Sequence, residues 1–337
     1  MATDSPIIST EASTAVSMAN SPHLEPTEVS KQADDAVSVE SGYGSAPPSA
    51  SASTARLPRV SLTPEHLRHL NKQLENMEPL DILRFAKIFF PNLYQTTAFG
   101  LTGLVTIDLL SKLEKEGPPA DAEPVNKHSV DLIFLDTLYH FDETYDLVER
   151  VRARYPGINI HSFKPDGFET AAEFEATYGK LYELSEEMYD YLAKVEPQER
   201  AYDNLEVVAV LTGRRRSQGG QRGDLDIIEV DDERGIYKIN PLANWSFGQV
   251  QAYVREHNVP YNVLLDRGYK SIGDWHSTSP VGEGEDERAG RWKGRNKTEC
   301  GIHNKQSRYA QFLAGNADAA APEADAGALA EKLSAIA

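Results

Sequence analysis

Residues 130–135 read VDLIFL, a nearly continuous apolar run of strand length that ends at Asp136-Thr137 and precedes a helical pattern over about 143–154. Runs of this kind are typical of strands buried on both faces of a parallel sheet. Three other segments have a strand pattern, at 93–98, 158–163 and 205–211. Because these strands alternate with helices, the sequence predicts an α/β protein with a mostly parallel sheet and flanking helices.

Three of the predicted strands end in segments with chemical character: TTAFGLTG at 96–103, LDT at 135–137 and LTGRRRSQ at 211–218. In parallel sheets, ligands bind at the carboxyl ends of the strands. Glycines and hydroxyls between a strand and a helix can form an anion site at the helix N-terminus. The 96–103 segment matches neither of the two common phosphate-loop motifs, so a purely structural turn explains it about as well.

Composition excludes several classes of function. The chain has 337 residues and a formal charge of −18, from 34 Lys+Arg against 52 Asp+Glu. Such acidity argues against nucleic-acid or anionic-membrane binding, which usually needs a basic face. No apolar stretch is long enough to span a bilayer, and the first 30 residues have no basic and apolar signal pattern. We therefore expect a cytoplasmic protein.

The composition divides the chain into three parts. Residues 1–56 contain 12 serines and one aromatic residue, which predicts a disordered tail. Residues 313–337 contain 11 alanines and predict a flexible tail. Between them, 57–312 is expected to be one catalytic domain. Thr63-Pro64 predicts the start of its first helix, which should continue through Leu74.

Basic residues cluster in two short segments of this acidic chain. Four arginines fall within 214–222, and five basic residues fall within 288–297. Two solvated loops would explain such runs. However, the first cluster directly follows a predicted strand and is succeeded by Ser217, Gln218 and two glycines. Arginine forks, hydroxyls and loop N–H groups bind phosphate and sulfate, so we expect a small polyanionic ligand.

The only cysteine, Cys300, lies in the polar segment KTECGIH just after the second basic cluster. A single thiol excludes internal disulfides, Cys-based zinc sites and cysteine-ligated iron–sulfur clusters. A lone cysteine is more often an inert residue, but the preceding cations would lower the thiol pKa and favour a nucleophilic thiolate. If Cys300 has a redox role, an external thiol must resolve its product. His303 would serve as an acid–base group or cap a turn, and Glu299 would orient a partner or handle a proton.

Five segments resemble the signatures of the phosphoadenylyl-sulfate (PAPS) reductases, in matching order and spacing: KVEP at 194–197, GRRRSQ at 213–218, KINPL at 238–242, SIGDWHST at 271–278 and ECGIH at 299–303. The resemblance runs from about Leu70 to Leu313. TTAFGLTG and the segment GEGEDERAGRWKG at 282–294 are similar to the fungal branch. The resemblance implies an adenine nucleotide α-hydrolase-like fold, related to the PP-loop ATP pyrophosphatases.

The resemblance also implies a reaction, which belongs to assimilatory sulfate reduction. Cys300 would attack the sulfate sulfur of PAPS, expel adenosine 3′,5′-bisphosphate and become an S-sulfocysteine. Thioredoxin, as electron donor, would then release sulfite. This agrees with the need for an external thiol and requires no bound cofactor. Members of the family tend to form dimers, so a homodimer is a further expectation.

The chain departs from its relatives at several places. Many carry SSSFG where this chain has TTAFG, and Asp-Thr-Gly where it has Asp136-Thr137-Leu138. The related adenylyl-sulfate reductases bind an iron–sulfur cluster through four cysteines, and the matching residues here are Tyr189, Asp190, Asp274 and Ser277. No such cluster can form, which favours the substrate that bears a 3′-phosphate.

The predicted catalytic residues are Cys300, His303 and Glu299, and no metal site is predicted. The predicted substrate-binding residues are Thr97, Phe99, Gly100, Asp136, Lys194, Arg214, Arg215, Ser217, Gln218, Arg291 and Lys293. Two alternatives stay open. A PP-loop ATP-dependent enzyme would need an SGGxDS-like loop, which the sequence lacks, and a non-catalytic nucleotide-binding protein would not need Cys300.

Overall fold

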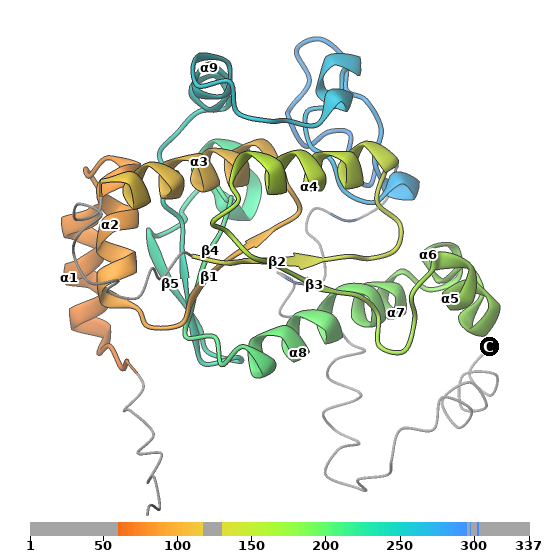
Figure 1. Ribbon diagram of the computed structural model, residues 1–337, viewed down its shortest axis with the longest axis horizontal. Helices are drawn as coiled ribbons and strands as arrows, with labels where there is room; N and C mark the ends of the chain where they lie inside the picture. The colour runs from red at the N-terminus through yellow and green to blue at the C-terminus, as the bar shows by residue number, and fades with distance from the viewer. Residues whose placement is uncertain (1–59, 117–129, 295–296, 298–301, 303–337) are drawn as a thin grey trace, which may run out of the picture. The chain divides into compact units, whose positions relative to one another are not determined.

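The described part of the molecule is built around a six-stranded sheet (Figure 1). The structure, a computed structural model, describes residues 60–116, 130–294, 297 and 302. The strand order is β3-β2-β1-β4-β6-β5, and all neighbours are parallel except β5 and β6. The strands are β1 (Leu93–Thr97), β2 (Leu132–Leu135), β3 (Ile160–Phe163), β4 (Ala209–Leu211), β5 (Ile228–Asp231) and β6 (Ile236–Ile239). This arrangement confirms the predicted α/β class with a mostly parallel sheet.

Helices cover both faces of the sheet. In Figure 1, α3 (Leu101–Lys115) and α4 (Asp142–Arg154) lie on one face, and α8 (Glu196–Asn204) lies on the other. Both α2 (Pro79–Phe89) and α9 (Phe247–Glu256) pack against α3. The remaining helices are α1 (Pro64–Leu74), α5 (Ala171–Tyr178), α6 (Leu181–Leu184), α7 (Glu186–Asp190), the π-helix η1 (Tyr191–Val195) and the short 3-10 turns η2 (Arg216–Gln218), η3 (Gly220–Arg222), η4 (Val263–Arg267) and η5 (Trp275–Ser277).

Helix α3 lies at the centre of the main core. Every residue from Leu101 to Ser111 is buried, because the sheet, α2 and α9 surround it. Its sequence is apolar almost all round, which is typical of a helix enclosed on every side. Each buried leucine or valine contributes about 1.5 to 3 kcal/mol of transfer free energy, so this helix is firmly fixed. Its N-terminus, which faces the functional loops, is correspondingly fixed.

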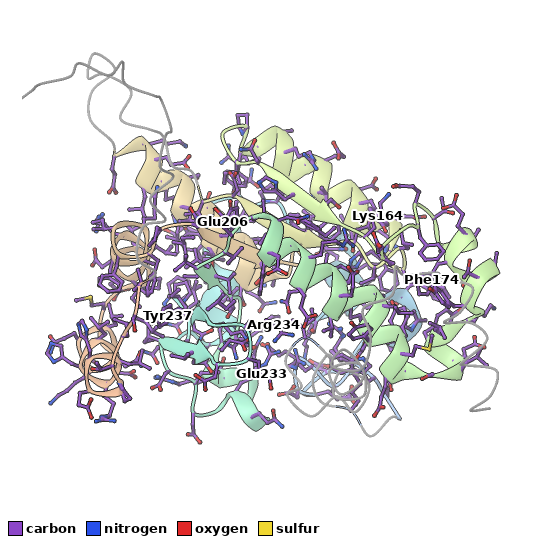
Figure 2. The ribbon with its side chains drawn as sticks, turned by 90° about the horizontal axis from the view of Figure 1, so that it is seen from below. Lys164, Phe174, Glu206, Glu233, Arg234 and Tyr237 are labelled. Carbon is purple, nitrogen blue, oxygen red and sulfur yellow. The ribbon has the colours of Figure 1, made fainter. Side chains whose placement is uncertain are left out.

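A smaller aromatic core supports the loop that follows β2. Tyr139 packs edge-on against Phe174, Tyr182 and Tyr189. Figure 2, seen from below, shows Phe174 beside Lys164 at the β3 end of the sheet, while Tyr237 of β6 lies at the opposite end. The aromatic cluster therefore holds Tyr139, and with it the loop after β2, in place.

The local signals in the sequence agree with part of the observed elements. The first helix begins as predicted, since the Thr63 side chain accepts a hydrogen bond from the His66 N–H. The predicted strand 205–211 was too long: β4 starts only at Ala209, because Glu206 adopts a positive φ of 48° in a turn. The antiparallel pair β5–β6 and the helices α2, α5, α6, α7, α8 and α9 were not predicted.

The strand order places a ligand site at one particular edge. From β1 the chain proceeds through α3 to β2 on one side, whereas β4 lies on the other side of β1. In such sheets the loops leaving the two central strands diverge and leave a crevice at their carboxyl ends. The loops after β1 and β4 are 98–103 and 212–218, two of the three segments that the sequence marks.

Candidate functional site

A pocket lies where the sheet order predicts it. Its wall is formed by the loops that follow β1, β2 and β4 together with the 270–292 segment. The wall includes Thr97, Phe99, Gly100, Thr102, Lys194, Arg214, Arg215, Gln218, Glu287, Arg288, Arg291 and Ile302. Segments that are far apart in sequence, such as Thr97 and Ile302, thus meet at one place.

The loop after β1 is a tight turn into α3. The Thr97 hydroxyl accepts a hydrogen bond from the Phe99 N–H at 2.9 Å, and Phe99 has a positive φ of 56°. A Cβ at Gly103 would lie 3.0 Å from Thr97 Oγ1, so this glycine is required for the close approach. A Cβ at Gly100 would meet nothing within 4 Å. The N-terminus of α3 therefore faces space in which an anion can approach its N–H groups.

The three arginines at 214–216 are each paired with a carboxylate from a distant segment. Arg214 contacts Glu229, Arg216 contacts Glu75, and Arg215 contacts Glu287. Arg214 and Arg215 line the pocket, whereas Arg216 points to the helical layer around Glu75. The cluster is thus divided between pocket wall and scaffold, and its charge is largely balanced within the fold.

Arg215 is a fully buried arginine, with 1% of its surface exposed. Its Nε donates to Thr102 Oγ1 at 2.9 Å, and its Nη1 donates to Ser217 Oγ at 2.6 Å. Its Nη2 donates to both oxygens of Glu287, at 2.8 and 2.6 Å. The guanidinium is held in a fixed orientation at the pocket wall, with a carboxylate on one edge.

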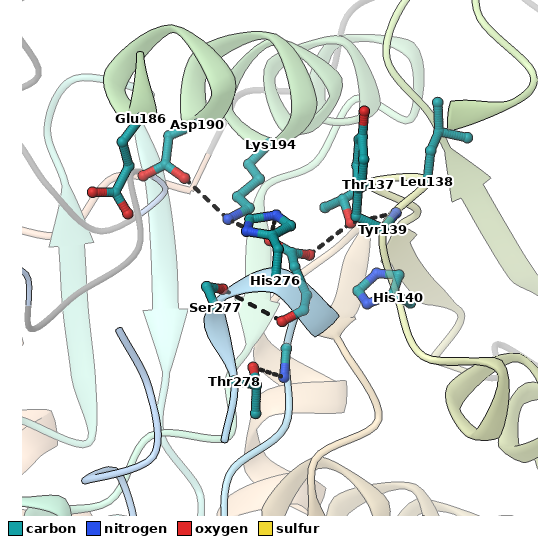
Figure 3. Close-up of polar contacts among 12 residues, drawn as sticks. Thr137, Leu138, Tyr139, His140, Glu186, Asp190, Lys194, His276, Ser277 and Thr278 are labelled. Carbon is teal, nitrogen blue, oxygen red and sulfur yellow. Dashed lines mark hydrogen bonds and ion pairs between the residues drawn. The ribbon is translucent and has the colours of Figure 1, made fainter. Parts of the chain in front are cut away.

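Lys194 lies at another part of the wall, in a buried network of opposite charges (Figure 3). Its Nζ is 3.0 Å from Asp190 Oδ1 and 2.8 Å from Asp274 Oδ2. Lys297 also contacts Asp190, with 2.5 Å between Nζ and Oδ2. The Thr137 hydroxyl donates to Asp274 Oδ1 at 2.7 Å. Two lysines and two aspartates thus balance one another in the interior.

Electrostatics keeps both aspartates of this network ionised. Burial by itself raises the pKa of Asp274. The positive charges of Lys194 and His140, together with hydrogen bonds from Lys194 and Thr137, lower this pKa well below its usual range. Burial likewise raises the pKa of Asp190, and Lys194 and Lys297 lower it by more. Charged partners in a low dielectric have this effect because each stabilises the ionised form of the other. Both aspartates therefore stay ionised at neutral pH.

Arg291 lies directly over a glycine of the pocket wall. A Cβ at Gly273 would be 2.3 Å from Arg291 Nη2, so a larger residue there would displace the end of the Arg291 side chain. The Trp292 ring covers the guanidinium, with 4.6 Å from Cζ to the ring centroid. Arg291 is therefore preorganised beside the segment that carries Asp274, in the manner of an arginine that recognises a planar anion.

Three predicted substrate-binding residues lie outside the pocket wall formed by the described residues. Asp136 accepts hydrogen bonds from the Leu138 N–H and the Tyr145 hydroxyl, which fix the turn after β2. Ser217 contacts Arg215 and the Trp245 carbonyl, and therefore orients an arginine of the wall. Lys293 is exposed. The other eight predicted substrate-binding residues line the wall.

The turn after β2 contains a residue with an uncommon backbone conformation. Leu138 adopts a φ of 68°. This left-handed conformation suits glycine and is uncommon for a leucine. The Asp136 carboxylate holds the turn through its 3.0 Å hydrogen bond to the Leu138 N–H.

The predicted catalytic residues Glu299, Cys300 and His303 lie outside the described residues. Two neighbours in sequence are described. Ile302 lines the pocket, and Lys297 contacts Asp190 and Glu186 at the Lys194 network. Of these two residues, Ile302 therefore belongs to the pocket wall and Lys297 to the charge network of Lys194.

Sequence reasoning did not identify Thr102, Glu287 or the pairing of Lys194 with Asp190 and Asp274 as parts of the site. Asp190 and Asp274 were noted only as positions that lack cysteines.

No described helix has the length and apolarity needed to cross a membrane. Over the same part of the chain, no group of three or more His, Cys, Asp or Glu side chains is arranged to hold a metal ion.

Comparison with known proteins identifies relatives of this chain. Residues 92–280 match the model of the phosphoadenosine phosphosulfate reductase domain. The chain is 59% identical over 277 residues to the phosphoadenosine phosphosulfate reductase of Emericella nidulans, covering 82% of this chain and 86% of the relative. It is 54% identical over 259 residues to the Saccharomyces cerevisiae protein of that name, covering 75% and 95%. Among solved structures, PAPS reductase from Candida auris in its phosphate complex is 53% identical, with a TM-score of 0.58 and coverage of 66% of this chain and 100% of the other.

Proposed function

The chain belongs to the phosphoadenosine phosphosulfate reductase family, and we propose that it reduces PAPS to sulfite and adenosine 3′,5′-bisphosphate through Cys300, with thioredoxin as the electron donor. The observation that carries this proposal is the meeting of arginines, a helix N-terminus and Ile302, two residues after the only cysteine in the sequence, at one pocket. The same pocket would serve a non-catalytic nucleotide-binding protein, but such a protein needs no thiol.

The proposed reaction has two steps. The Cys300 thiolate attacks the sulfate sulfur, a sulfur–sulfur bond forms, and the bond from sulfur to the phosphate oxygen breaks with its electron pair leaving on adenosine 3′,5′-bisphosphate. A thioredoxin thiolate then attacks Cys300 Sγ of the S-sulfocysteine, and sulfite leaves. The second thioredoxin thiol closes the disulfide of thioredoxin and regenerates Cys300. Two electrons pass from the dithiol to the substrate sulfur.

The described residues supply the positive charge that is needed when the Cys300 thiolate approaches the sulfate of PAPS. Arg288 and Arg291 lie in the pocket wall, and Lys194 lies there with its charge network. Cations and fixed donors lower the repulsion between a thiolate and a sulfate and stabilise the charge that develops on the leaving phosphate. The proposed roles of Glu299 and His303 are local: they would handle a proton or orient a partner near the thiol.

Cys300→Ser tests this proposal. We expect sulfite formation from PAPS and thioredoxin to be abolished, while calorimetry shows adenosine 3′,5′-bisphosphate binding unchanged, because the hydroxyl keeps the size of the side chain but is a poor nucleophile at neutral pH. Retained turnover would refute the thiol mechanism. If the variant loses both nucleotide binding and turnover, the cysteine has a structural role.

A further inference from the structure

The carboxylate of Glu287 occupies one amino group of the Arg215 guanidinium, a position that a phosphate can also take. Both Glu287 oxygens accept from Arg215 Nη2, at 2.8 and 2.6 Å, and both residues line the pocket. Carboxylates and phosphates compete for arginine donors because each offers acceptor oxygens and negative charge to them.

The remainder of the Arg215 site is made of neutral groups. Thr102 Oγ1 accepts from Nε, while Ser217 Oγ and the Trp245 carbonyl accept from Nη1. Among the described residues, Glu287 is the one carboxylate hydrogen-bonded to this buried guanidinium. A buried arginine without an anionic partner is strongly unfavourable, so something anionic must occupy this position in every state.

Glu287 is suited to be replaced. It lies in the 282–294 segment, 72 residues from Arg215, and within the described part of the chain its carboxylate hydrogen-bonds only to Arg215. The neighbouring Glu283, Glu285 and Asp286 are exposed. A rotation of the Glu287 side chain toward solvent therefore breaks the bonds to Arg215 and leaves the hydrogen bonds of its neighbours in place.

The charges of the substrate indicate which anion takes its place. In PAPS the sulfate and the 5′-phosphate carry one negative charge each, whereas the terminal 3′-phosphate carries about two. Arg215 bonds to Glu287, whereas Lys194 contacts Asp190 and Asp274, so the two cations are separate positions for an anion. The 3′-phosphate is the substrate group that brings the most charge to Arg215.

We propose that Glu287 determines substrate specificity, by occupying the 3′-phosphate subsite on Arg215 until a 3′-phosphorylated nucleotide displaces it. A phosphate brings about two negative charges to replace one, so the exchange keeps the guanidinium compensated. A nucleotide with a 3′-hydroxyl brings no charge, and Glu287 stays in place. This inference rests on the proposed substrate, but its test measures binding in the absence of turnover.

Glu287→Gln tests the proposal with two nucleotides that differ at one position. Calorimetry should show adenosine 3′,5′-bisphosphate binding tightened about ten-fold, or about 1.4 kcal/mol, because its competitor is gone. Adenosine 5′-monophosphate, which lacks the 3′-phosphate, should bind within about two-fold of its affinity for the unaltered chain. Glu283→Gln is the matched control, since it removes the same charge from an exposed position in the same segment, and it should change neither affinity.

The opposite results would overturn the proposal. If Glu287→Gln weakens the bisphosphate or leaves it unchanged, Glu287 is a permanent part of the wall. If it tightens both nucleotides equally, Arg215 does not distinguish the 3′ position. Should Glu287→Gln fail to fold, Glu287→Asp keeps the charge but shortens its reach, and it should tighten the bisphosphate alone by a smaller factor; no tightening would again overturn the proposal. Because sulfite is not measured, these outcomes are distinct from a failure of the thiol mechanism.

Discussion

In one part of the pocket wall Lys194 is held between two aspartates, whereas in another part Arg215 is held by the single carboxylate of Glu287. Asp190 and Asp274 are bonded to further groups of the framework, Lys297 and Thr137. The Glu287 side chain is similarly buried, with 9% exposed, but it has no other hydrogen-bond partner in the described part of the chain. The comparison teaches that buried charges of one pocket serve different purposes. Lys194 and its two aspartates are a fixed part of the fold, whereas the contact between Arg215 and Glu287 can be exchanged for a ligand.

The largest effect on stability is expected from a substitution in the Lys194 network. Asp274→Asn should lower the free energy of unfolding by about 3 to 5 kcal/mol, because Lys194 loses a charged partner in a buried site. Urea denaturation measures this. Asp232→Asn, at an exposed position, is the control and should change stability by less than about 0.5 kcal/mol.

The pH dependence of the same variant sharpens the result. The pKa values of Asp190 and Asp274 are lowered in the folded state. Their contribution is therefore complete above the unfolded value, near 3.8, and is lost as pH falls from there through the folded values. The unaltered chain should lose stability steeply below about pH 4, and Asp274→Asn less steeply. If Asp274→Asn loses less than about 1 kcal/mol of unfolding free energy at neutral pH, and its stability falls with acid as steeply as that of the unaltered chain, the network is not a stabilising element.

A smaller effect, on nucleotide affinity, is expected from substituting Arg215. Arg215→Ala should weaken adenosine 3′,5′-bisphosphate binding about ten-fold or more, because the charge-assisted fork is lost. Arg216→Ala is the matched control: it removes the adjacent arginine, which contacts Glu75 away from the pocket, and its nucleotide affinity should stay within about two-fold of that of the unaltered chain. Equal effects of the two substitutions, measured by calorimetry, would contradict the division of the cluster into pocket wall and scaffold.

Much of the fold could be predicted from local patterns. VDLIFL and the other apolar runs predict parallel strands because a strand buried on both faces needs apolar residues at every position. The pair β5–β6 was missed, since IEVD and IYKI are short and mix charged with apolar residues. An edge strand is buried less completely, so its periodicity is weaker. The start of β4 was misplaced because Leu205 and Val207 are apolar for packing reasons although Glu206 forms a turn.

The site could be predicted as a set of loops, but its pairings could not. The loop segments are marked by residue type, and the rule for carboxyl ends brings them to one edge. Which carboxylate partners which arginine depends on contacts over long separations, such as the 141 residues between Glu75 and Arg216. Composition showed two basic clusters as sources of positive charge, whereas the fold neutralises most of the first one internally.

The central claim, that Cys300 accepts the sulfate group, is tested most directly by mass spectrometry of the protein mixed with PAPS in the absence of any reductant. The account predicts one added sulfonate, located on the peptide that contains Cys300 and removed by reduced thioredoxin with release of sulfite. Release of adenosine 3′,5′-bisphosphate from PAPS with no adduct on Cys300, or an adduct on another residue, would contradict it.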